Sequence, residues 1–187
     1  QQGAARSLGY TVRRTMQVAQ RLYEGKTISG RGSVGLITYM RTDSTRVSEE
    51  ALGAVRSYIG ATFGAEALPA EPRRFKQKKD AQDAHEAIRP TYFDLPPDLA
   101  APYLEPDELK LYKLIWNRFV ASQMNPAIID QTSADIAAGG YTFRATGSVV
   151  KFPGFMAVYI EEKAEDQQPT DDEASEAVLP PLTEGET

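Results

Sequence analysis

One short segment of the sequence combines side chains that can handle a phosphate group. Residues 38–45, TYMRTDST, close an apolar run with a tyrosine, an arginine, four further hydroxyls and a carboxylate. A phenol has a pKa of about 10 and is a poor nucleophile until a cation or a base helps to remove its proton. Arg41 can favour the phenolate of Tyr39 and hold phosphate oxygens in its planar fork. The alternative is a buried tyrosine, a surface Arg–Asp pair and a helix-capping cluster.

A second motif, AHEAIRPT at residues 84–91, places a histidine and an arginine four positions apart. We expect residues 80–89 to form a short helical piece that ends before Pro90, so that His85 and Arg89 share one helical face. Both side chains can contact phosphates. Taken alone, the motif also fits a histidine buried for structural reasons.

The charges are divided unevenly along the chain. Residues 1–125 hold 18 Lys and Arg against 14 Asp and Glu, whereas residues 126–187 hold 3 against 12. A basic helix at 13–21 and a basic loop at 69–80 therefore lie within a chain whose net charge is −5. This distribution permits a nucleic-acid partner that is bound through its phosphates, without an obvious base-reading pattern.

The composition excludes several classes of protein. Without cysteine the chain has no disulfide scaffold, Cys-zinc site, iron–sulfur cluster or thiol catalysis. A single histidine argues against multi-His metal sites and most His-centred triads. No apolar run is long enough to span a membrane and no signal peptide is visible, so a cytoplasmic location fits. The chain begins at Gln1 without an initiator methionine, and we expect it to be a segment of a longer protein.

Apolar residues recur at helical spacing in three stretches that can position the two motifs. We expect helices over residues 11–24, 49–63 and 106 to about 125. Ser48 is a suitable N-cap for the second helix, and Pro106 is suited to the first position of the third. On the first helix the predicted apolar face consists of Val12, Met16, Ala19 and Tyr23.

The remaining segments indicate loops and strands. Residues 25–35 hold four glycines and predict a flexible loop. Residues 128–136 and 141–150 are predicted strands on either side of Gly139-Gly140, which is a hairpin signal. Residues 155–161 form a predicted third strand.

These elements predict an α+β fold with two parts. Residues 1–125 form a mainly helical domain with the tyrosine near the start of a helix, and residues 126–187 form a partial antiparallel β-sheet. Residues 161–187 hold ten acidic side chains and three prolines, as in a solvated loop or tail. Exposed apolar strand edges in such a partial sheet would favour self-association.

Four familiar binding patterns fail on inspection. GRGSVG at 30–35 precedes a strand-like run instead of opening a helix, so it does not predict a dinucleotide site. Gly25-Lys26-Thr27 lacks the earlier glycine of a P-loop, and His85-Glu86 lacks the second histidine of a zinc protease. The acids at 171–173 lie in a strongly acidic stretch that is better explained as solvated chain. No metal ligand set is predicted.

Together the two motifs resemble the type IA DNA topoisomerases, most closely bacterial DNA topoisomerase I. The resemblance is carried by GLITYMRTDST at 35–45 and AHEAIRPT at 84–91. RRTMQVAQRLYE at 13–24 is similar to the helix before the family's active-site strand, and LYKLIWNRFVASQMNPA at 111–127 to the helix after its histidine motif. The strands up to about residue 160 resemble part of the family's arch. The glycine-rich stretch 26–34 looks like an insertion.

The resemblance implies a DNA-cutting activity that needs no ATP. In this family a tyrosine attacks a phosphodiester of one strand and stays bonded to the 5′ phosphate. Another strand passes through the gap, and the 3′ hydroxyl reverses the reaction, which relaxes negatively supercoiled DNA. Tyr39 matches the nucleophile and Arg41 matches the arginine that steadies the scissile phosphate. The implied supporting or DNA-binding positions are Thr38, Thr42, Asp43, Ser44, His85 and Arg89.

The resemblance also implies what this chain does not contain. The family's Mg²⁺-binding acids, with a catalytic lysine and glutamate, belong to an N-terminal Toprim domain that nothing in this sequence matches. Mg²⁺ is therefore an expected cofactor of the full-length enzyme, with none expected in this chain. The expected partners are a single-stranded segment of negatively supercoiled DNA and the Toprim domain of the same parent chain, with no membrane. These 187 residues alone are expected to be inactive.

Two alternatives from other classes stay open at this point. A non-catalytic module for single-stranded DNA would keep the basic helix and loop but would not need Tyr39. A protein-interaction domain would use the acidic residues 161–187 to bind a basic partner. The second alternative leaves both motifs unexplained.

Overall fold

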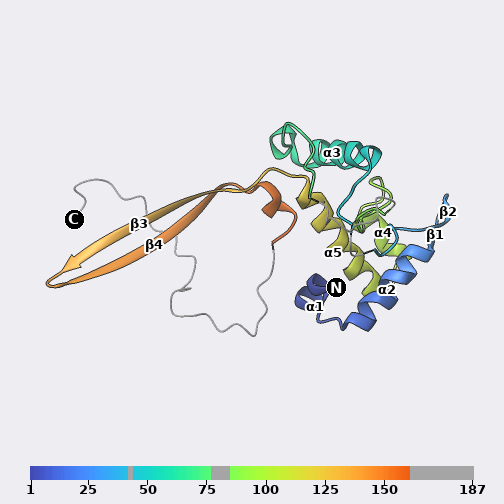
Figure 1. Cartoon of the computed structure of the whole chain (residues 1–187), viewed down its shortest axis with the longest axis horizontal. Coiled ribbons are helices and arrows are strands. Elements are labelled where there is room, and N and C mark those ends of the chain that lie inside the picture. Colours follow the sequence, from blue (N-terminus) through green and yellow to red (C-terminus); the bar gives the residue numbers. More distant parts are fainter. Residues whose placement is uncertain (42–43, 77–84, 161–187) are drawn as a thin grey trace.

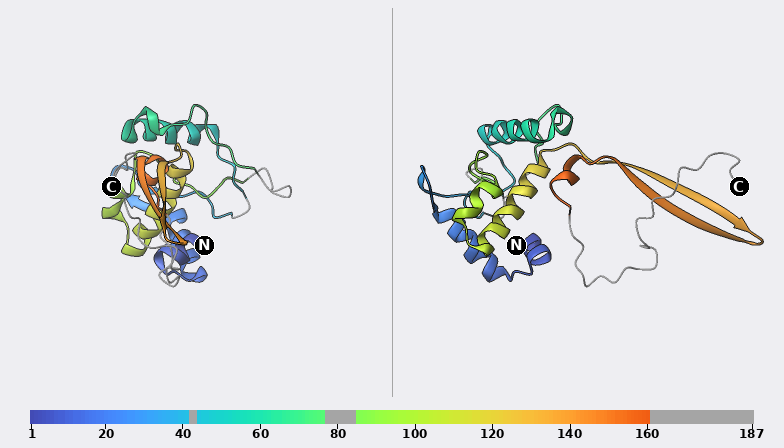
Figure 2. Two further views of the ribbon diagram at one scale, coloured as in Figure 1. Left: turned by 90° about the vertical axis from the view of Figure 1, so that its left-hand side faces the viewer. Right: turned by 180° about the vertical axis from the view of Figure 1, so that it is seen from behind.

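A long β-hairpin projects from one end of a helical body (Figure 1). The computed structural model describes residues 1–41, 44–76 and 85–160. The view from behind shows the same separation of hairpin and helices (Figure 2, right). Helices and small antiparallel sheets are mixed in this way in an α+β fold, which confirms the predicted class.

Two long helices, α2 (Val12–Glu24) and α5 (Pro106–Ser122), pack against one another beside the short α1 (Gln2–Leu8). Both helices were predicted, and both start with local signals: the Thr11 side chain accepts the Arg14 N–H, and Pro106 occupies the first turn of α5.

The predicted apolar face of α2 was partly wrong. The helix buries Thr15, Val18, Ala19 and Leu22, whereas Val12 and Tyr23 are exposed. The face of α2 that packs against α5 is therefore a neighbouring stripe of the helix and not the predicted one.

Helix α3 (Glu49–Phe63) begins at the predicted cap, where the Ser48 hydroxyl oxygen accepts the Ala51 N–H. Two glutamates in its first turn lie at the positive end of the helix dipole. Its apolar stripe packs on the core through Val55 and Ile59, which are fully buried. The proline-rich connection before α5 contains the short helix α4 (Pro97–Ala100).

The prediction of a flexible loop over residues 25–35 was wrong. Strands β1 (Lys26–Ile28) and β2 (Gly32–Val34) pair as a small antiparallel hairpin. Gly30 and Gly32 have φ of 77° and 74°, which allows the tight turn. At the tip, Arg31 forms an ion pair with Asp94, so the turn is docked on the helical body.

Strands β3 (Ile128–Ala138) and β4 (Tyr141–Phe152) form the projecting hairpin, as predicted from the glycine pair between them. The predicted third strand was wrong for its described part, because Gly154–Ala157 forms a 3₁₀ turn. Gly154 has φ of 50° and lies against the Asn125 carbonyl, so the chain turns back towards α5 there. Residues 161–187 lie outside the described part.

The core lies between α2, α3 and α5 in the helical body. Its aromatic centre is built around Trp116, which packs edge-on against Tyr58 with ring centroids 5.2 Å apart. Leu36 and Ile37, just before the candidate tyrosine, are 0% and 1% exposed in the same core. In the part of the chain that is described, no helix is long and apolar enough to cross a bilayer.

Candidate active site

The segment that carries Tyr39 pairs with the segment that carries the histidine motif. Ile37 forms an antiparallel bridge with Pro90. The Thr91 N–H donates to the Leu36 carbonyl at 3.1 Å, and the Thr38 N–H donates to the Arg89 carbonyl at 3.0 Å. This pairing brings the two motifs together across about fifty residues of sequence.

The same pairing explains why the predicted helix over 80–89 was wrong for its described residues. Residues 85–89 are not helical. Their backbone groups bond to the tyrosine segment, which a helix would have prevented. His85 and Arg89 therefore do not share a helical face.

Two predicted hydroxyls are used inside the protein. The Thr38 hydroxyl donates to the Ala87 carbonyl at 2.7 Å and accepts the Arg89 N–H at 3.0 Å. The Ser44 hydroxyl donates to the His85 carbonyl at 2.6 Å, and its oxygen accepts the Arg46 N–H at 3.2 Å. Ser44 is also buried. The hydroxyls of Thr38 and Ser44 thus link the tyrosine segment to the backbone of the histidine motif.

The side chain of Tyr39 takes no part in this pairing and points outward. Its side chain is 51% exposed, and its ring meets the ring of Tyr23 edge-on, with centroids 5.4 Å apart. The Arg41 N–H donates to the Tyr39 carbonyl at 2.9 Å, which closes a three-residue turn. The predicted place near the start of a helix was wrong, because α3 begins only at Glu49.

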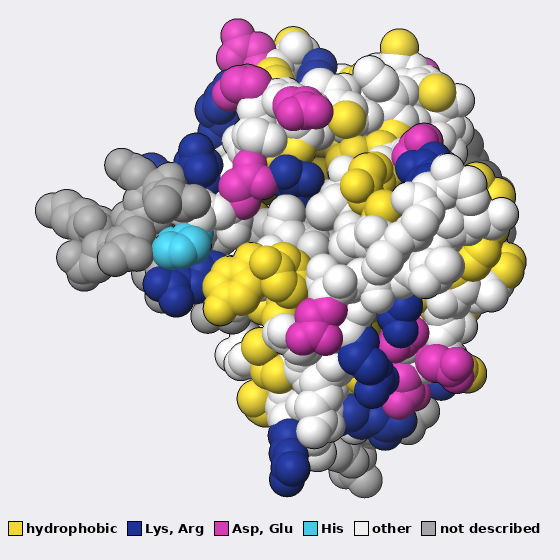
Figure 3. Space-filling model, turned by 90° about the vertical axis from the view of Figure 1, so that its right-hand side faces the viewer, with side chains coloured by type: hydrophobic (Ala, Val, Ile, Leu, Met, Phe, Trp, Pro, Cys, Tyr) yellow, Lys and Arg dark blue, Asp and Glu magenta, His cyan; other side chains and the backbone are white. Residues whose placement is uncertain are grey.

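A surface pocket of about 240 Å³ gathers the motif residues. It is lined by Thr38, Tyr39, Arg41, His85 and Glu86. Figure 3 shows the single histidine at the surface, beside an apolar patch and a group of Lys and Arg side chains. A phenol, a guanidinium and an imidazole around one hollow can bind a phosphodiester and attack it.

His85 has an open hydrogen-bonding position. Its Nδ1 atom is buried and has no hydrogen-bond partner among the described residues. Its carbonyl accepts the Ser44 hydroxyl, so the backbone is fixed while the ring keeps an unused polar atom. A buried polar nitrogen without a partner is unusual, so this atom is expected to bond to a group that the described residues do not supply.

Arg89 lies behind the pocket instead of lining it. Its side chain is 12% exposed and forms a 2.6 Å ion pair with Glu86, and it also donates to the Pro90 carbonyl. Glu86 was missed in the sequence, where it drew attention only as part of a failed zinc-protease pattern. The spacing of three between Glu86 and Arg89 suggests an ion pair only on a helix, which these residues do not form. Thr42 and Asp43 lie outside the described residues.

A larger cavity of about 430 Å³ lies between α2, α5 and the segment after Tyr39. Its lining is mainly apolar, with side chains such as Met16, Leu111 and Ile115, and it reaches Met40 and Ser44. The smaller pocket remains the candidate site because it contains the phenol, the guanidinium and the imidazole.

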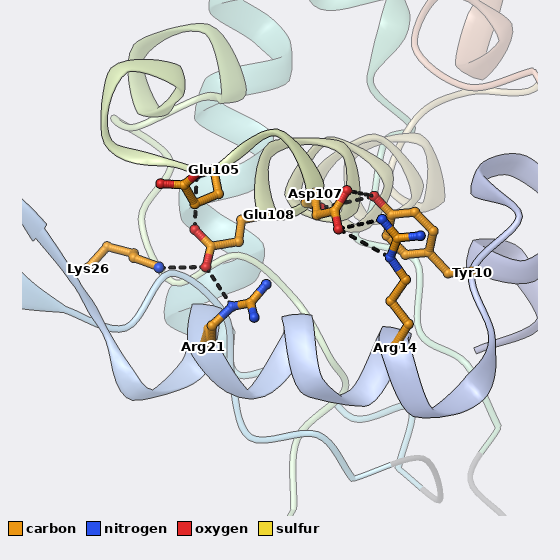
Figure 4. A network of polar contacts seen from close by, with 7 residues as sticks. All are labelled: Tyr10, Arg14, Arg21, Lys26, Glu105, Asp107 and Glu108. Carbon is orange, nitrogen blue, oxygen red and sulfur yellow. Dashed lines mark hydrogen bonds and ion pairs between the residues drawn. The ribbon is translucent and has the colours of Figure 1, made fainter.

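Ion pairs join α2 to α5 and so fix the position of α2, the helix against whose end the tyrosine segment lies (Figure 4). Glu108 on α5 is 1% exposed and accepts from Arg21 at 2.8 Å and from Lys26 at 2.6 Å. Burial works to raise the pKa of Glu108, but the hydrogen bonds from Lys26, the Glu105 backbone and Arg21 outweigh it and hold the pKa below its ordinary value. The carboxylate is therefore charged at neutral pH.

Asp107, the neighbouring acid on α5, forms a second ion pair with α2. It accepts from Arg14 at 2.6 Å and from the Tyr10 hydroxyl at 3.1 Å. The Arg14 hydrogen bond lowers the pKa of Asp107, while burial and the nearby carboxylate raise the pKa of Tyr10. The two ion pairs lie at either end of α2 and fix its rotation relative to α5.

The described residues do not fit a metal site. Among residues 1–41, 44–76 and 85–160, no group of three or more His, Asp or Glu side chains could hold an ion. Glu86 lines the pocket, but its carboxylate is paired with Arg89. No step of the chemistry is therefore assigned to a metal held by this part of the chain.

Comparison with known proteins matches the whole chain. A family model described as DNA topoisomerase covers residues 1–187. DNA topoisomerase 1 from two strains of Xylella fastidiosa, Temecula1 and 9a5c, is 51% identical over 188 residues, which is 100% of this chain and 23% of each relative. Full-length topoisomerase I from Thermotoga maritima superposes with a TM-score of 0.73 at 40% identity, over 91% of this chain and 27% of that one. This chain therefore belongs to the bacterial type IA DNA topoisomerase family.

Proposed function

We propose that this chain supplies the nucleophilic tyrosine of a type IA DNA topoisomerase. The Tyr39 hydroxyl oxygen attacks the phosphorus of one phosphodiester, and the bond from phosphorus to the 3′ oxygen breaks. The phenol proton passes to a base, and the leaving 3′ oxygen takes up a proton. After another strand passes, the 3′ hydroxyl attacks the 5′-phosphotyrosine and restores both groups. One phosphoester replaces another, so the cycle needs no ATP.

The pocket of Tyr39, Arg41 and His85 is the observation that supports this proposal most strongly. Arg41 offers a planar fork to two phosphate oxygens and stabilises the charge that develops on them. His85 brings an imidazole to the same hollow, where it can bind the DNA near the break.

The remaining predicted residues fall into two proposed roles. Thr38 and Ser44 hold the tyrosine segment to the histidine motif through the hydrogen bonds of their hydroxyls. Thr42 and Asp43 stay proposed DNA-binding positions from the resemblance. Arg89 reaches DNA only if a phosphate takes the place of Glu86, since the two are paired at 2.6 Å.

Cleavage is proposed to need more than these residues. The chain spans about a quarter of the length of the curated relatives it matches. We propose that Mg²⁺ is bound by a Toprim domain of a longer protein, which acts in the cytoplasm on negatively supercoiled DNA. By itself the chain should bind single-stranded DNA weakly and should not cut it.

The binding half of this proposal is tested with salt. A handful of phosphate contacts makes the affinity for a single-stranded oligonucleotide fall steeply between about 50 and 200 mM salt. Fluorescence anisotropy titrations of the 187-residue chain measure this dependence. An affinity that does not change with salt would contradict binding through phosphates.

The catalytic half is tested on a full-length protein that carries this segment. It is incubated with Mg²⁺ and a single-stranded oligonucleotide labelled at the 3′ or the 5′ end, and quenched with detergent. Protein should retain the 3′-labelled piece covalently, and Tyr39→Phe should retain neither. If DNA binds and no adduct forms in the wild type, the enzyme proposal fails and a non-catalytic module for single-stranded DNA takes its place.

A further inference from the structure

Tyr23 is an aromatic side chain for which the fold has no evident need. It is the last but one residue of α2, is 39% exposed and does not belong to the core cluster. Its ring lies edge-on to Tyr39, with centroids 5.4 Å apart and planes inclined by 64°. An edge-to-face arrangement of this kind is a favoured aromatic contact and has a defined geometry. The question is what this contact does for the outward-pointing phenol.

The backbone fixes the distance between the two tyrosines. The Leu36 N–H donates to the Leu22 carbonyl at 2.8 Å, so the tyrosine segment starts directly at the end of α2. A Cβ atom on Gly35 would lie 2.5 Å from the Tyr23 carbonyl oxygen, which is closer than real Cβ atoms approach. Glycine at this position therefore lets the segment lie against the helix end.

Helix α2 is held in place by contacts other than the one between Tyr23 and Tyr39. Arg21 in its last turn and Lys26 just after it both bind the buried carboxylate of Glu108 on α5. Tyr23 lies between these two anchors in the sequence. The ring that faces Tyr39 thus belongs to a segment whose position and rotation are set by the helical body.

A half-exposed phenol on a three-residue turn needs such a support. Without a neighbour, the ring of Tyr39 can rotate about its side-chain bonds into solvent. In-line attack on a phosphorus atom depends on the position of the hydroxyl oxygen, and a misplacement of about 1 Å can slow such a reaction about a hundredfold. The Tyr23 ring lies against one side of Tyr39 and limits these rotations.

We infer that Tyr23 is a positioning residue that holds the Tyr39 ring in the orientation for attack, an inference that rests on the proposed function. Tyr23 makes no covalent bond and transfers no proton in this role. The support comes from its ring and not from its hydroxyl. Phenylalanine should therefore replace it, whereas an aliphatic side chain should not.

The test uses a full-length protein that carries this segment, in the wild-type, Tyr23→Leu and Tyr23→Phe forms. Tyr103→Leu is the matched control, because Tyr103 is 37% exposed and lies outside the pocket. Single-turnover formation of the covalent adduct is measured beside the dissociation constant for the same oligonucleotide. We expect Tyr23→Leu to slow adduct formation about tenfold to a hundredfold, with the dissociation constant changed less than about twofold. Tyr23→Phe and Tyr103→Leu should stay within about twofold of the wild type.

A spectroscopic readout follows the contact without catalysis. With 3-fluorotyrosine at position 39, the ¹⁹F resonance senses the ring current of the neighbouring aromatic side chain. The shift should be the same in the wild type and Tyr23→Phe, and should move in Tyr23→Leu. This readout is unaffected by a general loss of activity, and it applies even if Tyr23→Leu lowers the stability.

Each outcome decides a different question. A wild type that forms no adduct removes the proposed function, and with it the reaction that Tyr23 would support. If the wild type forms the adduct and Tyr23→Leu forms it equally fast, the positioning role alone is wrong. Equal losses in Tyr23→Leu and Tyr23→Phe would assign the effect to the hydroxyl and overturn the inference. So would an unchanged ¹⁹F shift in Tyr23→Leu.

Discussion

The tyrosine segment and the β3–β4 hairpin both expose large side chains, but their support differs. Behind Tyr39, the chain is tied to the histidine motif by hydrogen bonds and rests on Leu36 and Ile37 in the core. The hairpin is a two-stranded ribbon whose register places Ile136 opposite Phe143 on one face. Those two side chains are 55% and 60% exposed. Exposure at Tyr39 is thus an isolated feature of a rigid scaffold, whereas exposure along the hairpin is general.

This difference indicates where a substitution should matter. A change behind Tyr39 alters a packed region and shifts the phenol, while the same change in the hairpin alters a surface with no core beneath it. Each change in the helical body can therefore be compared with a chemically similar change in the hairpin.

The largest effect is expected from Leu36→Ala. Leu36 is fully buried, so removing its side chain leaves a cavity and should lower the free energy of unfolding by about 3 kcal/mol. Ile136→Ala is the hairpin counterpart and should change it by less than about 0.5 kcal/mol. Urea denaturation of both variants measures the difference. Equal losses would mean that the hairpin has a core of its own.

A smaller loss is expected from Glu108→Gln. The change leaves Arg21 and Lys26 without a counter-charge, but both partners are partly exposed, so we expect a cost of about 2 kcal/mol at neutral pH. Asp135→Asn breaks the solvent-exposed pair with Arg144 in the hairpin and should leave the melting temperature unchanged.

The Glu108 contribution should also depend on pH in one direction. Its folded pKa lies below the ordinary glutamate value of about 4.3, so the stabilisation is complete above that pH. It should be lost as the pH falls through the lowered folded pKa. Thermal melts of wild type and Glu108→Gln from neutral to acidic pH should therefore converge at low pH. Curves that stay parallel would show that the carboxylate is not the stabilising group.

Thr38→Val should cost about 1 kcal/mol. It removes the hydroxyl that bonds to both Ala87 and Arg89 and leaves two backbone groups without that partner. Thr38→Ser should restore the stability, because serine keeps the hydroxyl. In the hairpin, Thr146 shares an exposed hydroxyl contact with Ser133, so Thr146→Val should have almost no effect. Chemical denaturation is the measurement, and a Thr146→Val loss as large as that of Thr38→Val would contradict the comparison.

The smallest effect on the fold is expected from Phe143→Ser. This change removes the largest apolar side chain of the exposed pair on the hairpin face. It should reduce self-association of the 187-residue chain in sedimentation velocity while the melting temperature stays the same. Equal association of both forms would show that the apolar face of the hairpin does not drive it.

Local signals predicted the three long helices and the long hairpin well, whereas the short helices α1 and α4 were not predicted. The Ser48 cap, Pro106 in the first turn of α5 and the glycine pair at 139–140 each act within a few residues. One error arose where distant segments meet. Residues 85–89 were predicted to be helical from their own composition, but pairing with the tyrosine segment keeps them out of a helix.

The candidate site was predictable in its residue types and less so in its contacts. Tyr39, Arg41 and His85 were identified from two short motifs, and the pocket contains all three. The internal hydrogen bonds of Thr38 and Ser44 depend on the histidine motif, which is distant in sequence. Tyr23 was predicted to lie on the apolar face of its helix, but the core does not cover that position. Side-chain partners more than a few residues apart leave no periodic trace in one sequence.

The most direct test of the central claim locates the covalent bond on the protein. The detergent-trapped adduct of a full-length protein carrying this segment is digested with nuclease and protease, and the modified peptide is sequenced by mass spectrometry. We predict a nucleotide 5′ phosphate on the hydroxyl oxygen of Tyr39 and none on Tyr23, although the two rings are in contact. A phosphate on Tyr23, or on any residue outside the pocket, would contradict the account.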